Sequence, residues 1–452
     1  MKTRKKLLVG GAMLAFSAVS YGQFTMSGEI RPRMEYRHGY KSLADSNQAH
    51  AAFTDQRSRL NFNYKDEGYQ VKLVLQDIRV WGAAKQLNTA DGFSSIHEAW
   101  GQAFINENWS LKAGRQEIIY DDHRIFGSVG WAQQARSHDA IQVKYQKEGM
   151  KIDITGAYNQ DGAGLVGTSS ALGSTAGNYK AFQSIWFNKK IGDNLQTSIL
   201  FLNNGKQANW VDTLGNTQYH DNYTQTIGTH TKYKKEKLSV AFNGYYQMGK
   251  VNSVPAKDVS AYLVGLDLGY KINDNFSATL GFEMQSGQDQ TDTTTAYNEV
   301  NHSFSPFYGT NHKFNGFIDY FYVGNHFNSV GLQDIYAKIK YKKEKSYVGL
   351  DFHMFSSAAN ISDGYKLATD TSAAYNAAMS KNLGMEIDLS FGFQLSKGVM
   401  LKGGYSQMLG TESLAWLKGV TDYKGQGRTD QISNWGYVMV IFKPTFIKTE
   451  KK

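Results

Sequence analysis

The chain has 452 residues, with 49 lysines and arginines against 40 aspartates and glutamates, and it contains no cysteine. The lack of cysteine excludes a disulfide framework and any thiolate-ligated metal site. Past the first twenty residues, no segment approaches the roughly 18 consecutive apolar residues of a transmembrane helix.

Residues 1–22 have the pattern of a secretion signal, with a basic start, a short apolar stretch over 7–19 and small residues at Ser20 and Gly22. We expect cleavage before Gln23. Removal of four positive charges lowers the formal net charge from +9 to about +5. The remaining residues, 23–452, are expected to form one domain. Because export takes the chain out of the cytoplasm, we expect no nucleic-acid partner.

Apolar and polar residues alternate along many segments, most clearly over 383–395, where every odd position from Leu383 to Leu395 is apolar. Period-two alternation predicts strands with one apolar and one polar face. Eighteen such strands are predicted, at 23–40, 53–64, 69–82, 95–106, 109–120, 139–147, 150–161, 179–190, 195–205, 223–234, 238–249, 259–272, 276–287, 331–344, 346–358, 383–396, 399–410 and 434–446.

The links between these strands alternate strictly between short and long. The long ones are 41–52, 83–94, 121–138, 162–178, 206–222, 250–258, 288–330, 359–382 and 411–433. A soluble sandwich has no reason to keep its long loops at one end. The pattern predicts an all-β chain that forms a transmembrane antiparallel β-barrel in the outer membrane, with short periplasmic turns and long extracellular loops.

Aromatic residues flank the short turns on the apolar face, as an interfacial girdle would. The pairs are Tyr64 with Tyr69, Tyr270 with Phe276, and Tyr341 with Tyr347. The last strand ends at Phe446, in keeping with the terminal aromatic of outer-membrane barrels. Surrounding lipid is therefore an expected partner.

Arginine is confined to one part of the exported chain. Apart from Arg428, every arginine after the leader lies between residues 31 and 136: Arg31, Arg33, Arg37, Arg57, Arg59, Arg79, Arg115, Arg124 and Arg136. Alternation puts the first strands' arginines in the lumen, and a register break near Asp77 would bring Arg79 there too. Glu29 and Asp77 are candidate acidic partners. Either this is a solvated, salt-bridged interior, or it is a path selective for anions.

Several motifs, in order, resemble the alginate-export family of outer-membrane barrels. They are residues 76–82 (QDIRVWG), 97–100 (HEAW), 114–117 (GRQE), the loop 120–139, residues 312–316 (HKFNG), 319–321 (DYF) and His353. The resemblance implies an eighteen-stranded barrel that carries a polyanionic sugar past an arginine-lined constriction. It implies that Arg79, Arg115 and Arg136 line this path, with Glu98 and Asp139 as acidic partners. An export role would also require periplasmic partners.

Two long links have unusual composition. Residues 121–138 carry Phe126, Val129 and Trp131, whose burial would stabilise a loop by roughly 1.5–3 kcal/mol each. We therefore predict that this loop folds inward against the first strands and brings Arg124 or Arg136 near Arg79 and Arg115. The aromatic-rich link 288–330 has three interpretations: an inward plug, a carbohydrate-stacking platform, or a self-packed cap.

Enzyme motifs are missing: the chain has no G-x-S-x-G, no H-E-x-x-H and no P-loop. His123, His138 and Asp122 do not form a recognisable catalytic set. No spacing supports a transition-metal site, and Asp121 with Asp122 would bind Ca²⁺ weakly at most. We expect no cofactor. The predicted function is a channel for an acidic, alginate-like polysaccharide. The alternatives are a less specific porin for small anions or sugars, and a surface-binding protein anchored by its barrel.

Overall fold

The computed structural model describes residues 22–160, 162–163, 165, 179–422 and 424–449. The predicted signal peptide lies outside them, apart from its last residue. The wall strands are β1 (Gln23–His38), β2 (Ala51–Lys65), β3 (Tyr69–Val80), β4 (Ser94–Phe104), β5 (Trp109–Gln116), β6 (His138–Lys147), β7 (Met150–Tyr158), β8 (Ala181–Ile191), β9 (Leu195–Val211), β10 (Thr217–Lys235), β11 (Leu238–Lys250), β12 (Asp258–Lys271), β13 (Phe276–Gln285), β15 (Leu332–Lys343), β16 (Ser346–Ser356), β17 (Asn382–Ser396), β18 (Val399–Gly410) and β19 (Ser433–Phe442).

These strands form a closed barrel. Each pairs antiparallel with the next, β13 pairs with β15, and β19 returns to β1 with Tyr36 opposite Gly436. The two-residue β14 (Val300–Asn301) is a parallel bridge to β12 and not part of the wall. The prediction of a closed, eighteen-stranded antiparallel barrel is confirmed.

The observed strand boundaries differ most from the predicted ones in three places. The predicted link 206–222 is mostly strand, because β9 and β10 continue as a hairpin to a turn in which Asp212 accepts two backbone hydrogen bonds. β5 ends at Gln116, so the following loop starts earlier than expected. The last strand is interrupted at Pro444, which has no N–H to donate, and resumes as β20 (Thr445–Lys448) against β1.

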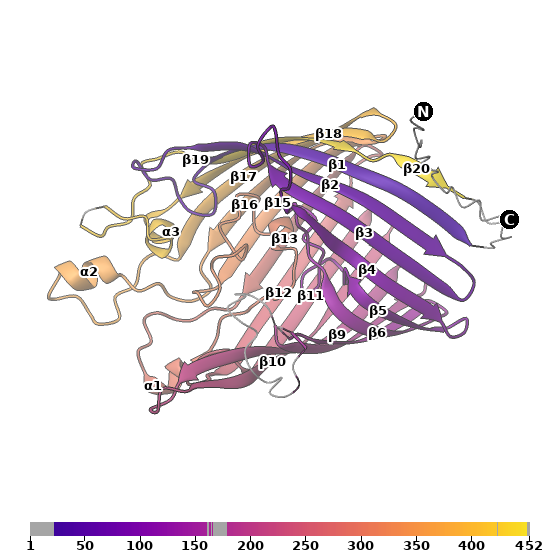
Figure 1. Ribbon diagram of the computed structural model, residues 1–452. Coiled ribbons are helices and arrows are strands. Elements are labelled where there is room, and N and C mark those ends of the chain that lie inside the picture. The colour runs from indigo at the N-terminus through magenta and orange to yellow at the C-terminus, as the bar shows by residue number, and fades with distance from the viewer. Residues whose placement is uncertain (1–21, 161, 164, 166–178, 423, 450–452) are drawn as a thin grey trace, which may run out of the picture.

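The described long links lie at one end of the barrel, here called the loop end, and the short turns lie at the other, the turn end, where β1 begins and β20 ends (Figure 1). The described parts of the long links contain three short helices: α1 (Thr295–Asn298), α2 (Gly364–Thr369) and α3 (Glu412–Leu417). A 3-10 helix, Asn311–Lys313, lies in the link before β15. No helix in the described ranges is long and apolar enough to cross a membrane.

Burial is inverted relative to a soluble protein. On β17, Met385 and Leu389 are 39% and 41% exposed, whereas Glu386 and Asp388 are 0% and 1% exposed. The apolar face points outward to lipid and the polar face points into the lumen. Leu383 is an exception to the predicted face, since it is a bulge residue before Gly384 (φ 116°) and is buried inside.

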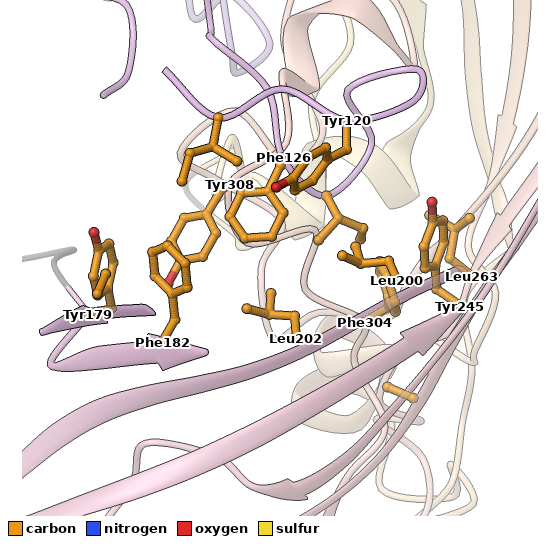
Figure 2. Close-up of a cluster of buried hydrophobic side chains, with 14 of the residues drawn as sticks. Tyr120, Phe126, Tyr179, Phe182, Leu200, Leu202, Tyr245, Leu263, Phe304 and Tyr308 are labelled. Atoms are coloured by element: carbon orange, nitrogen blue, oxygen red, sulfur yellow. The ribbon is translucent and has the colours of Figure 1, made fainter. Parts of the chain in front are cut away.

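The lumen holds two apolar clusters. One gathers Phe126, Phe182, Leu202 and Tyr308 around the inner faces of β8 and β9 (Figure 2). The other lies toward β16–β19 and includes Trp435. Both consist of wall residues packed against loop residues, so the long links supply much of what fills the barrel.

Candidate functional site

Within the described part of the chain, two long links enter the lumen and meet there. The first inward loop is residues 117–137 and the second inward loop is residues 286–331; together they are called the plug. The Gly127 N–H donates to the Tyr308 carbonyl at 2.9 Å, and the Thr310 N–H donates to the His123 carbonyl at 3.0 Å. Phe126, which is 0% exposed, forms a bridge with Tyr308. The predicted inward fold of the first loop is confirmed, and of the three interpretations of the second, the structure shows the inward plug.

Arginines of β1 and β2 hold the first inward loop. Arg31 donates to the Gly130 carbonyl at 2.8 Å and to the Gln133 side chain at 3.0 Å. Arg33 donates to the Trp131 carbonyl at 2.8 Å, and its guanidinium lies 4.3 Å from the centre of the Trp131 ring. Arg57 donates to the Gln133 carbonyl at 3.2 Å. These lumen-facing arginines therefore bind mainly to the first inward loop.

Carboxylates on the same two strands balance this charge. Glu29 accepts from Arg57 at 2.8 Å, and Asp55 accepts from Arg33 at 2.8 Å. Glu35 also forms an ion pair with Arg33, with an N–O distance of 2.7 Å. Adjacent guanidiniums are tolerated in this buried place because each has an acid or a carbonyl beside it.

The plug is anchored to the opposite wall by buried acids. Arg124 of the first inward loop forms an ion pair with Glu283 on β13, with side chains 5% and 3% exposed. Asn315 of the second inward loop donates to Glu283 at 3.0 Å and to Asp334 on β15 at 3.2 Å. The Ile318 N–H donates to Glu386 on β17 at 2.8 Å. The plug thus spans the lumen from β1–β2 to β13–β17.

Cavities lie on both sides of the plug. A cavity of about 770 Å³ faces the turn end and one of about 490 Å³ faces the loop end. Trp131 and His312 line both of them and stack on each other with ring centres 4.5 Å apart. This stacked pair therefore lies between the two cavities.

The turn-end cavity is strongly basic. Its described lining contains two carboxylates, Glu29 and Asp351, and seven cations: Arg31, Arg57, Lys313, Lys338, Lys340, Lys402 and Lys443. Lys338 pairs with Asp351 at 3.3 Å and Lys443 with Glu29 at 3.3 Å. The remaining excess of positive charge would attract anions and repel cations.

Comparison with known proteins decides the family. A model described as alginate export matches residues 25–409. The chain belongs to the alginate export family. No curated protein matches it. As a member of this family it is an outer-membrane channel and not an enzyme.

Solved structures support the fold. Pseudomonas aeruginosa OpdQ matches with a TM-score of 0.56 at 11% identity, covering 94% of this chain and 98% of that chain. Acinetobacter baumannii OccAB4 matches with a TM-score of 0.58 at 10% identity, and the match covers 94% of this chain and 98% of that chain. Pseudomonas aeruginosa OpdK with vanillate matches with a TM-score of 0.55 at 10% identity, and the match covers 93% of this chain and 99% of that chain. At such identities the likeness concerns the fold alone.

Arg79 and Asp77 lie on the outer face of this alginate-export barrel, not in its lumen. They pair in register with Gln56 and Ser58, which share the face of the lipid-side Leu60. Their side chains pair with each other there, at 2.5 Å. The predicted register break lies one strand later, in β4 at His97–Glu98. The expectation that Arg79 and Asp77 line the lumen is wrong.

Arg115 and Asp139 also point outward. Both share the face of Leu111 and Ile141, and they form an ion pair at 2.6 Å whose side chains are 46% and 56% exposed. Arg124 instead pairs with Glu283 across the lumen, and Arg136 donates to the Gly309 carbonyl of the second inward loop. The expectation of a constriction containing Arg79 and Arg115 is therefore wrong as well.

The other predicted residues lie inside. Arg59 donates to Gln76 at 2.9 Å, and its Nη2 is buried with no described partner. Glu98 forms an ion pair with Lys72. Arg136 donates to the Gly309 carbonyl at 3.1 Å, and burial lowers its pKa to about 10. Arg136 therefore stays charged at neutral pH.

Sequence reasoning missed the lysines of the turn-end cavity, listed above. The signal was present, because Lys338 and Lys340 alternate with the outward-facing Ile335, Ala337 and Ile339. Lys402 follows the outward-facing Leu401 in the same way.

Proposed function

We propose that this channel passes an acidic polysaccharide or oligosaccharide, such as alginate, by attraction between sugar carboxylates and lumen cations. The basic turn-end cavity carries the proposal, because its seven cations face only two carboxylates. A partly solvated contact between unit charges at 4 Å is worth about 1–4 kcal/mol. Several weak contacts of this size allow a chain to enter and still leave.

The proposed path runs from the turn-end cavity past Trp131 and His312 to the loop-end side. In this proposal Lys338, Lys340 and Lys402 are the cations that attract the cargo. The lumen arginines of the first strands mainly fix the position of the plug, through the carbonyl contacts described above. Arg59 and Arg136 remain proposed contacts, because neither has a carboxylate within ion-pair distance in the described chain.

A less specific channel for small anions or sugars is the second candidate. It is favoured by the plug, which leaves cavities of about 490 and 770 Å³ that suit small solutes better than a polymer. The two candidates differ in whether chain length matters. An anchor for surface binding is disfavoured by membership of an export family.

The test is ion current through single channels in a planar bilayer, with oligouronates or neutral oligosaccharides of equal length added to one side. The proposal predicts that only the uronates block the current, and that longer uronates block for longer. Equal blockade by neutral sugars would favour the less specific porin. No conductance under any condition would overturn both channel proposals.

A further inference from the structure

A third cavity, of about 390 Å³, lies on the loop-end side of the plug against the inner faces of β9 and β10. Its described lining contains five asparagines, two cations and no carboxylate. Amides present both donors and acceptors, which match the hydroxyl groups of a sugar. The cations add a preference for negative charge.

Asn222 is the central observation. It is 4% exposed and lines the cavity from β10, with Lys206 opposite it on β9. Within the described residues, neither its Nδ2 nor its Oδ1 has a hydrogen-bond partner. Buried polar groups in native proteins are almost always paired, so an amide left open toward a cavity indicates a ligand or water there.

The two cations of the cavity are also available. In the described chain neither Lys206 nor Arg136 has a carboxylate within ion-pair distance. The Arg136 guanidinium donates to the Gly309 carbonyl and lies 6.0 Å from the centre of the Tyr308 ring. Arg136 also lines the 490 Å³ cavity beside the Trp131–His312 pair. The amide-lined cavity therefore continues into the proposed path.

Aromatic rings form another side of the cavity. Phe307 and Tyr308 line it with ring centres 6.1 Å apart, and Tyr308 is held by a hydrogen bond to Asn204 and by the apolar cluster beneath (Figure 2). Phe307 has φ 39°, a left-handed value that non-glycine residues adopt at a cost. Flat apolar rings beside amides suit the C–H face of a pyranose.

We propose that this cavity is a subsite for one uronate residue of the transported chain, a proposal that rests on the proposed function. The carboxylate is held by Lys206 or Arg136, and the ring hydroxyls bond to the Asn222 amide. The sugar face packs on Phe307. The subsite lies on the loop-end side, so it holds the chain after or before it passes the plug.

The experiment is calorimetric titration of the detergent-solubilised barrel with a β-1,4-linked mannuronate trimer and with neutral mannotriose. We expect saturable binding of the uronate trimer. Asn222→Leu should weaken binding at least tenfold for both sugars. Lys206→Met should weaken binding of the uronate alone. Asn209→Leu is the matched control, because Asn209 lies on the same hairpin but faces outward and is exposed. A difference in gel migration between heated and unheated samples verifies that each variant is folded.

Unchanged uronate binding in Asn222→Leu would overturn the subsite and leave a water-filled cavity. An equal loss in Asn209→Leu would overturn it too, since the effect would then not be local. Bilayer recordings separate this failure from that of the proposed function. Uronate blockade together with unaffected Asn222→Leu binding refutes the subsite alone. Binding at the cavity without any uronate selectivity in the bilayer refutes the proposed function and leaves the cavity as a sugar site.

Discussion

Arg124→Met should loosen the plug, because it removes the cation that the first inward loop contributes to the far wall. Arg124 and Glu283 are almost fully buried, and Glu283 also accepts from Asn315 at 3.0 Å and Gln285 at 2.8 Å. The Arg124 guanidinium lies 3.3 Å from the centre of the Phe314 ring, where methionine would still pack. Loss of one partner of a buried pair costs about 3–5 kcal/mol.

We treat the plug as closed when it is bound in the lumen and open when it is released. Because about 1.4 kcal/mol corresponds to a tenfold change in an equilibrium constant, this cost raises the ratio of open to closed channels by about 100-fold to 4,000-fold. Single-channel recording measures the ratio as open dwell time over closed dwell time. Adding Glu283→Gln to Arg124→Met should recover part of the closed state, since no uncompensated charge then remains.

The matched control is Arg115→Met, which breaks an ion pair that is half exposed on the outer face. Exposed pairs contribute about 0–1 kcal/mol, so gating should be nearly unchanged. If Arg124→Met gates like the wild type, or if both variants change it equally, the plug is not held by the Arg124–Glu283 pair.

Two further changes test the plug from other directions. Burial lowers the pKa of His326 to about 3, so the closed plug keeps it neutral, whereas an opened loop binds a proton below about 6.5. The closed state should therefore weaken as pH falls from 6.5 towards 3, by up to about 1.4 kcal/mol per unit. Open dwell times should follow this trend in the wild type, and a His326→Gln channel with the same pH response would refute it. Phe126→Ala should cost about 3–5 kcal/mol of plug packing, since Phe126 is 0% exposed. Hydrogen exchange of residues 120–136 should accelerate, and unchanged exchange would contradict the packing argument.

The strands were predictable because their signal is local. Alternation along one strand assigns its faces without knowledge of any neighbour, and all eighteen predicted strands are present. The same alternation, applied without any register break, places Arg79 on the outer face with Val71 and Leu75, and Arg115 on the outer face with Leu111. The error for Arg79 arose from a register break assumed in β3, whereas the bulge lies at His97–Glu98 of β4, and the error for Arg115 arose from the family resemblance.

The sequence predicted that the first inward loop folds into the lumen, but it did not predict which residues the loop contacts there. Apolar residues in a polar loop indicate burial, but their partners are remote in sequence, as with Val129 and Thr310, which are 181 positions apart. Nor does composition reveal that Arg31 would bind loop carbonyls and not cargo, because that depends on where the loop ends up. The basic cavity likewise forms only when lysines from β15, β18 and the end of β19 come together across the closed barrel.

The most direct test of the central claim is the reversal potential of the triple variant Lys338→Gln, Lys340→Gln, Lys402→Gln under a salt gradient. These lysines line the basic turn-end cavity. The account predicts that the triple variant loses most of the anion preference, while the double variant Arg79→Gln, Arg115→Gln, altered only on the outer face, keeps it. An unchanged reversal potential in the triple variant, or an equal loss in the outer-face variant, would contradict it.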